Sequence, residues 1–165
     1  MSIVNQPDWE REQPRRFWDP GRKLLSSIRF YQRNKNKNSV YARFCCKLAV
    51  IRHRFWSIVT GADIPLNSKI GGGLMIPHPN GIVIHPRAII GPNCLFFQQV
   101  TIGSRDSDPP NIGEHVDIGA GAKVLGNIKI GNDVRIGANA VVVTDVDDNC
   151  TVGGIPARVL KQSND

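Results

Sequence analysis

A histidine between two prolines is the residue of this sequence best placed to do chemistry. Pro77 and Pro79 restrict the backbone on either side of His78, and Asp63 precedes the histidine by fifteen residues. A carboxylate bound to one imidazole nitrogen would fix the tautomer and leave the other nitrogen to take a proton from a hydroxyl. The pair would then act as a general base, with the nucleophile supplied by the substrate. Spacing alone leaves two alternatives open, a packed or solvated histidine and a turn-forming aspartate.

The element that must position these residues is an internal repeat of six. An apolar residue, often followed by glycine, recurs at this spacing: Ile64, Ile70, Ile76, Ile84, Ile90, Phe96, Ile102, Ile112, Ile118, Val124, Ile130, Ile136 and Val142. This period suits neither a helix nor a plain strand, but it suits a parallel β-helix with three flat sides. Each apolar residue should point inward and stack on its equivalent in the next coil. The fold expected is mainly β, a parallel β-helix preceded by a short helical region.

The six-residue period breaks twice, and both breaks should form loops. Two extra residues separate Ile76 from the next repeat, and four separate Ile102 from the next. Loops that leave a solenoid are its usual binding sites, because the coils themselves are occupied with packing. The first loop contains His78 and is followed by His85. At about eighteen residues per coil, Asp63 and His78 should lie on neighbouring faces at similar height.

Length and charge indicate one globular domain with a basic appendage. The chain has 165 residues and a formal net charge of +7. Residues 1–60 carry 13 Lys and Arg against 4 Asp and Glu, a net charge of +9, whereas residues 61–165 carry 8 against 10, a net charge of −2. No apolar stretch approaches the roughly 20 residues of a membrane span, and no apolar signal region opens the chain. We therefore expect a cytoplasmic protein.

The four cysteines are Cys45, Cys46, Cys94 and Cys150. They lack zinc-type spacing, and two of them are adjacent, which is a poor start for a disulfide framework. We expect reduced, mostly buried thiols and no metal site.

The basic N-terminal part predicts an extended arm followed by two helices. Residues 1–21 are polar and rich in proline, whereas 22–34 and 40–59 have apolar faces typical of amphipathic helices. Their main role should be to cap the open end of the β-helix. Interleaved cations and aromatic residues also suit a peripheral contact with the anionic inner face of a membrane. No recognised nucleic-acid-binding motif accompanies them, so nucleic acid is not an expected partner. We expect three parts: an arm with helices (1–60), the β-helix (61–143) and a capping tail (144–165).

Five motifs resemble the serine acetyltransferase branch of the hexapeptide-repeat acyltransferases. They are IGGGLMIPH (70–78), GIVI (81–84), QQVTIG (98–103), IGAGAKVLGNI (118–128) and GGIPAR (153–158). The resemblance covers about residues 61–160 and implies acetyl-CoA-dependent O-acetyl transfer by a homotrimer. It also implies a left-handed parallel β-helix, with acetyl-CoA bound in the groove between adjacent subunits.

The same resemblance implies roles for individual residues. The catalytic histidine of the family falls on His78, and the aspartate that orients it falls on Asp63. The groove for CoA, formed by backbone groups of Gly-Ala turns, falls on Ala120 and Ala138. Cations are electrostatically suited to bind the CoA phosphates. The candidates are Arg135, Arg158 and Lys161.

Two departures from the family concern the acceptor. In serine acetyltransferases an aspartate that helps to hold the substrate amine precedes the catalytic histidine, and here that residue is Pro77. Their second loop carries an Arg-His pair for the substrate carboxylate, whereas residues 104–111 read SRDSDPPN. We therefore expect acetyl transfer to another hydroxyl, that of a sugar on a lipid-linked or nascent polysaccharide. The chain also resembles acetyltransferases of exopolysaccharide pathways such as colanic acid synthesis.

Two alternatives remain open. The first is a serine O-acetyltransferase of cysteine biosynthesis that holds serine through other residues. His85, beside the first loop, and Arg105, in the second, are the candidates for acceptor binding. The second alternative is a non-catalytic β-helix scaffold or a membrane-surface binding protein.

Overall fold

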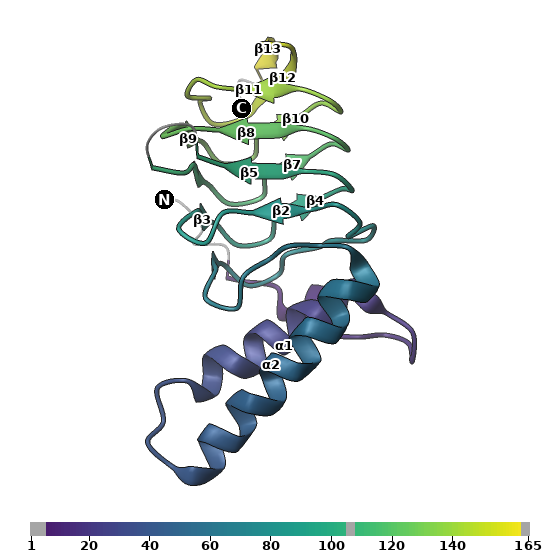
Figure 1. Ribbon diagram of the computed structural model, residues 1–165. Coiled ribbons are helices and arrows are strands. Elements are labelled where there is room, and N and C mark those ends of the chain that lie inside the picture. Colours follow the sequence, from purple (N-terminus) through teal and green to yellow (C-terminus); the bar gives the residue numbers. More distant parts are fainter. Residues whose placement is uncertain (1–5, 105–107, 163–165) are drawn as a thin grey trace.

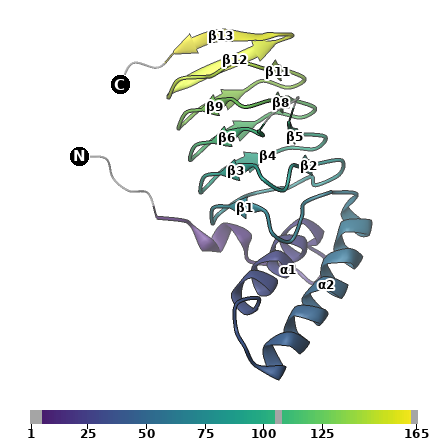
Figure 2. The ribbon, with the colours of Figure 1, turned by 60° about the vertical axis from the view of Figure 1, so that its left-hand side comes forward.

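The protein is a column of parallel β-coils standing on a helical hairpin (Figure 1). The computed structural model describes residues 6–104 and 108–162. The hairpin covers the first coil, and the last strand lies at the opposite end of the column (Figure 2). This arrangement confirms the parallel β-helix with a short helical region. Among the described residues, no helix is long and apolar enough to cross a membrane.

Two α-helices and a 3-10 turn precede the column. They are η1 (Trp9–Glu12), α1 (Pro20–Asn34) and α2 (Val40–Thr60). Pro20 suits the first turn of α1, and the Ser39 hydroxyl caps α2 by accepting a hydrogen bond from the Ala42 amide at 3.0 Å. Gly61 ends α2 in the left-handed conformation. Both helices agree closely with their predicted ranges. The 3-10 turn replaces part of the extended arm expected before them, because the Asp8 side chain caps it.

The strands form three sheets, one on each side of the column. The β1 sheet contains β1 (Lys69–Ile70), β3 (Ile89–Ile90), β6 (Asn111–Ile112) and β9 (Lys129–Ile130). The β2 sheet contains β2 (Val83–Ile84), β5 (Thr101–Gly103), β8 (Lys123–Leu125) and β11 (Val141–Val142). The β4 sheet contains β4 (Leu95–Phe96), β7 (Asp117–Ile118), β10 (Arg135–Ile136), β12 (Cys150–Gly154) and β13 (Ala157–Gln162).

Apolar repeat positions stack from coil to coil in the interior. Ile84 pairs with Ile102, and Ile102 pairs with Val124 in the following coil. Every repeat position from Ile64 to Val142 is at most 8% exposed. Burying a side chain of this size contributes about 1.5–3 kcal/mol, so the stacked positions supply most of the cohesion of the column.

Both breaks in the repeat leave the column at corners of the β2 sheet. The first loop (77–82) leads into β2, and the second loop (104–110) leads out of β5. The register on either side is undisturbed, because Asp63 still bridges Val83 and β3 still pairs in parallel with β6. The insertions therefore change the surface without changing the core.

The column extends beyond residue 143, where the sequence predicted its end. Val146 bridges Ile130, and β12 pairs in parallel with β10. β13 then reverses and pairs antiparallel with β12. The prediction missed this coil because Val146 follows Val142 by four residues instead of six, although the spacing of six resumes from Val146 to Val152.

An ion pair anchors the helices to the first coil. Arg29 Nη2 lies 2.7 Å from Glu12 Oε1, and Arg29 Nε donates to Glu12 Oε2 at 2.9 Å. The same guanidinium donates to the carbonyl oxygens of Ile70 and Gly71, both at 2.7 Å, while Glu12 Oε1 accepts a hydrogen bond from the Leu74 amide at 3.1 Å. The helices thus cover the first coil, as expected. Three side chains of α1 join the buried core cluster of the column: Leu24, Leu25 and Ile28.

Gly91 is a position where stacked coils leave no room for a side chain. A Cβ atom there would overlap the backbone of Gly113 in the next coil. Gly91→Ala is therefore expected to lower the free energy of unfolding by about 1–3 kcal/mol, because the backbone must shift. Gly137→Ala is the matched control, since its Cβ would stand 3.4 Å from the nearest atom, the Val152 oxygen. Urea unfolding measures both variants, and equal midpoints would contradict this prediction.

Candidate active site

The first loop presents His78 at the surface. His78 and Pro77 are exposed, and the flanking prolines restrict the backbone around the imidazole. The end of α2 supports the loop, because the Gly81 amide donates to the carbonyl oxygen of Gly61 at 3.0 Å. His78 therefore stands on an anchored turn that a substrate can reach.

Asp63 lies beside the strand that leaves the first loop. Its backbone bridges Val83 in parallel, and its amide donates to the carbonyl oxygen of Ile82 at 2.8 Å. Asp63 and His78 thus belong to adjoining segments at one end of the column. The contacts among the described residues include no hydrogen bond or ion pair between the two side chains. The orienting role of Asp63 stays a prediction.

Ala120 and Ala138 lie on the same corner of the column as the first loop. Backbone hydrogen bonds join successive turns of this corner: Gln99 N donates to Asn80 O at 2.8 Å, and Asn139 N donates to Ala120 O at 2.8 Å. Gly121 N completes the series by donating to Gln98 O at 2.9 Å. One continuous edge therefore runs from the loop of His78 past both alanines.

The corner also holds a buried polar atom that no described residue satisfies. Gln98 Oε1 is inaccessible to solvent and has no hydrogen-bond partner among the described residues. A buried acceptor left unpaired costs about 1–3 kcal/mol.

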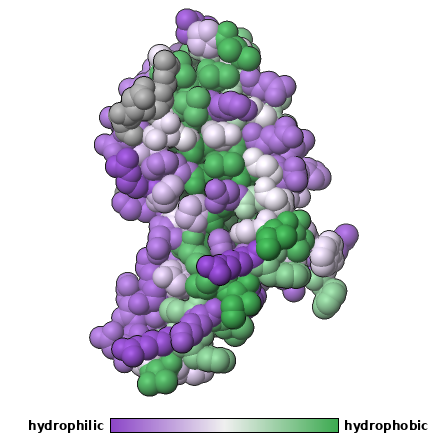
Figure 3. Space-filling view, viewed as in Figure 1, coloured by the Kyte–Doolittle hydropathy of each residue, from purple (hydrophilic) through white to green (hydrophobic). Residues whose placement is uncertain are grey.

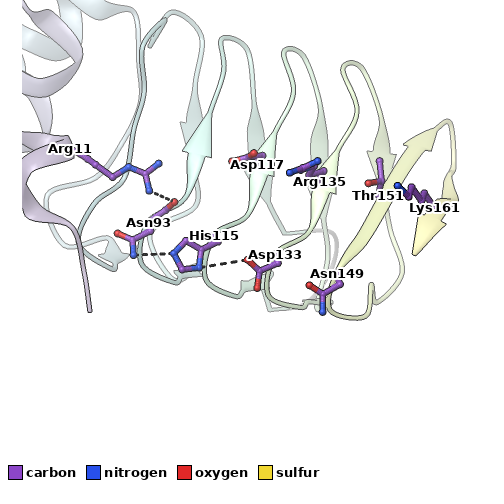
Figure 4. A pocket seen from close by; sticks show the side chains of 9 residues that line it. All are labelled: Arg11, Asn93, His115, Asp117, Asp133, Arg135, Asn149, Thr151 and Lys161. Atoms are coloured by element: carbon purple, nitrogen blue, oxygen red, sulfur yellow. Dashed lines mark hydrogen bonds and ion pairs between the residues drawn. The ribbon is translucent and has the colours of Figure 1, made fainter. Parts of the chain in front are cut away.

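Arg135 and Lys161 lie in a groove on the β4 sheet, whose cavity measures about 450 Å³. Figure 4 shows them in line with Arg11, Asp117 and Thr151 along the column. Arg158 does not line this groove; its Nη1 donates to the Ala157 carbonyl oxygen at 3.3 Å. Two of the three cations predicted for the CoA phosphates thus share one surface, and the third lies outside it.

Charge in this groove is mixed. Burial raises the pKa of the Asp117 carboxyl, and the positive charges of Arg135 and Arg11 only partly offset that effect. Asp133 adds a second carboxylate to the lining. A phosphate bound by Arg135 would therefore also meet negative charge, which makes the phosphate assignment weaker than the assignment of the alanine corner.

Polar residues in the left-handed backbone conformation form one wall of the groove. This row of residues was not predicted from the sequence. Its members are Asn93 (φ 61°), His115 (φ 54°), Asp133 (φ 56°) and Asn149 (φ 59°). The Asn93 amide lies 3.2 Å from His115 Nε2, and His115 Nδ1 lies 3.8 Å from Asp133 Oδ1. The sequence does contain a pattern that could have predicted this row, because each of its first three members follows a repeat glycine by two residues.

One of the two candidates for acceptor binding, His85, lies next to the strand that leads into the second loop, because its amide donates to the carbonyl oxygen of Ile102 at 2.8 Å. His85 is half-buried, and its Nδ1 accepts a hydrogen bond from the Arg87 amide at 3.2 Å. Arg87 Nη1 in turn forms an exposed ion pair with Asp108 Oδ1 at 2.7 Å. The other candidate, Arg105, lies outside the described residues. His85 and His78 therefore flank β2 from opposite corners.

The cysteines have no evident chemistry. All four are free, and Cys45, Cys94 and Cys150 are buried, as the sequence predicted. Burial raises the pKa of the Cys94 thiol to about 12, so this thiol is protonated at neutral pH and is a poor nucleophile. Within residues 6–104 and 108–162, no cluster of His, Cys, Asp and Glu side chains could hold a metal ion.

Comparisons with known proteins agree with the resemblance noted in the sequence. Residues 109–144 match the family described as bacterial transferase hexapeptide (six repeats). A serine acetyltransferase of Synechococcus elongatus is 46% identical over 110 residues, which are 64% of this chain and 45% of the relative. That of Mycobacterium tuberculosis is 44% identical over 120 residues, 70% of this chain and 52% of the relative. The chain thus spans about half the length of these curated relatives.

Solved structures extend the similarity to the helices. A serine acetyltransferase in complex with CoA aligns with a TM-score of 0.72 at 34% identity, covering 87% of this chain and 58% of the other. The Neisseria gonorrhoeae serine acetyltransferase in complex with serine aligns with a TM-score of 0.71 at 36% identity, covering 86% and 57%. The structural similarity to serine acetyltransferases, together with the hexapeptide-repeat match, supports a left-handed β-helix.

Proposed function

We propose that this chain, which is similar to serine acetyltransferases and matches the bacterial transferase hexapeptide family over residues 109–144, transfers an acetyl group from acetyl-CoA to an acceptor hydroxyl. The observation that carries the proposal is the edge that joins the exposed loop of His78 to the turns of Ala120 and Ala138. A serine acetyltransferase of similar structure is solved in complex with CoA, which supports CoA as the carrier of the acetyl group. We further propose a homotrimer with the CoA groove between adjacent subunits.

The reaction requires one base and one set of hydrogen-bond donors. His78 takes the proton of the acceptor hydroxyl while its oxygen attacks the thioester carbon. The tetrahedral oxyanion is stabilised by backbone amides, a new C–O ester bond forms, and the C–S bond breaks. The imidazolium then returns its proton to the departing thiolate, so that CoA leaves as a thiol. Asp63, in an orienting role, would hold the tautomer that accepts the proton.

L-serine is the better supported acceptor. The relatives reported above carry the serine name, and one is solved with serine bound, which favours the alternative in the sequence analysis over a polysaccharide sugar. One observation keeps the sugar as a second candidate. Pro77, which precedes His78, offers no charge to a substrate amine.

Supplying the missing carboxylate should therefore improve the use of serine. Pro77→Asp is expected to raise kcat/KM for L-serine about tenfold or more, because a charge-assisted hydrogen bond to the substrate amine is gained. Pro77→Ala is the control that removes the proline without adding charge. Release of CoA thiol, followed with L-serine and with free sugars, measures both variants. A wild-type enzyme that acetylates sugars at least tenfold better than serine, with no gain in Pro77→Asp, would favour the polysaccharide acceptor.

A further inference from the structure

Helix α2 has an apolar stripe on its outer side that no described residue covers. Its members follow each other at alternating steps of three and four residues, which places them along one face of the helix. Their exposed fractions run from 41% at Leu48 to 83% at Ile58. The apolar stripe consists of Tyr41, Phe44, Leu48, Ile51, Phe55 and Ile58. A different face of α2, with Ala42, Cys45 and Ala49, is buried in the fold.

Cations border this stripe. Helical spacing places Arg43, Lys47 and Arg54 along one edge. From residue 20 to residue 60 the chain contains ten Lys and Arg and no Asp or Glu. Figure 3 shows long hydrophilic side chains lying next to apolar ones over the hairpin. Whatever covers the apolar stripe must therefore also accept positive charge.

Further aromatic side chains are exposed near the C-terminal end of α2. Phe17 is 91% exposed and Trp18 is 61% exposed. The Trp18 ring packs against Trp56 with centroids 5.8 Å apart, and Lys23 Nζ lies 5.7 Å from the centroid of Phe17. Exposed aromatic rings beside cations are typical of surfaces that enter the headgroup region of a bilayer.

We infer that the apolar stripe of α2 docks this protein on an anionic lipid surface. A twofold pairing of two such stripes fits poorly, because it would bring together cations with no carboxylate between them. An anionic bilayer accepts both features, since the apolar side chains enter the acyl boundary and the cations meet lipid phosphates. Each engaged Lys or Arg strengthens such binding about fivefold.

The docked orientation has a consequence for the proposed active site. The end of α2 carries Ile58 and continues directly into Gly61, whose carbonyl oxygen accepts the hydrogen bond that supports the first loop. Docking through α2 would therefore hold His78 close to the lipid surface. This consequence rests on the proposed function, whereas the docking itself does not.

Vesicle sedimentation of the full chain tests the inference. We expect binding to phosphatidylcholine vesicles that contain about 30% phosphatidylglycerol, much weaker binding to pure phosphatidylcholine, and weakening as NaCl rises. Ile51→Glu and Phe44→Glu should each lower the partition coefficient at least tenfold. Leu160→Glu, an equally exposed apolar position on β13 at the far end of the column, should leave it unchanged.

Two further measurements on the same variants separate the possible outcomes: light scattering gives the particle mass, and CoA release gives the rate of acetyl transfer. Unchanged particle mass and unchanged acetyl transfer to soluble acceptors in Ile51→Glu, with lost vesicle binding, would support docking. Failure of the full chain to bind anionic vesicles, or an equal loss in Leu160→Glu, would overturn it. A change of particle mass in Ile51→Glu would assign the stripe to contact between copies instead. Docking without acetyl transfer by the wild type would refute the proposed function alone.

Discussion

His78→Ala is expected to lower turnover about 10²- to 10⁴-fold, the usual contribution of a positioned general base. The side chain is exposed on an anchored loop, so its removal should leave the free energy of unfolding unchanged. CoA binding should also persist, because the alanine corner lies on other turns of the column. Initial rates of CoA release, with CoA affinity from calorimetry, separate the loss of chemistry from a loss of binding.

Asp63→Asn is the companion variant, since it keeps the size of the side chain and removes its charge. It should cost less than His78→Ala if Asp63 only orients the imidazole. A His78→Ala enzyme with nearly normal turnover would reject the assignment and turn attention to His85 or His115.

Arg29→Met is expected to destabilise the fold by about 3–5 kcal/mol, the usual cost of leaving one partner of a buried ion pair unpaired. The Glu12 side chain is only 6% exposed and would retain the Leu74 amide as its partner. The helices should then loosen from the first coil. Chemical unfolding followed by circular dichroism measures the change.

Two further variants separate this effect from a general loss of charge. Arg87→Met breaks an ion pair whose side chains are 64% and 67% exposed, so it should cost less than about 1 kcal/mol. Glu12→Gln combined with Arg29→Met should recover part of the loss, because no carboxylate remains buried alone. Equal stabilities for Arg29→Met and Arg87→Met would show that the anchor is unimportant.

The six-residue period was enough to predict the column, because one physical requirement repeats in it. Each inward position must be apolar to stack on the next coil, and positions such as Ile84, Ile102 and Val124 meet that requirement. The departures from the period located both loops, and with them His78. The apolar faces of the two helices also placed their ends within two residues of those observed, 22–34 against Pro20–Asn34 and 40–59 against Val40–Thr60.

Features that depend on partners remote in sequence were not predictable in this way. The pairing of Glu12 with Arg29 joins the arm, α1 and the first coil, and no periodicity links these segments. No sequence repeat predicts that β13 reverses and pairs antiparallel with β12. Arg135 lies on β10 and Arg158 on β13, so their positions relative to the groove depend on how these strands pair. The resemblance could therefore identify the candidate cations but could not predict which of them share the groove.

The antiparallel return of β13 also bears on the behaviour of the protein in concentrated solution. A stack of parallel coils is open-ended, and an uncovered last coil is a template on which another molecule can add strand by strand. β13 occupies that edge with the chain direction reversed and carries Arg158 and Lys161, while the hairpin closes the other end. The reversed direction of β13 and its positive charges together oppose end-to-end polymerisation into fibres. Uncovered ends of a repeat architecture would otherwise favour such polymerisation.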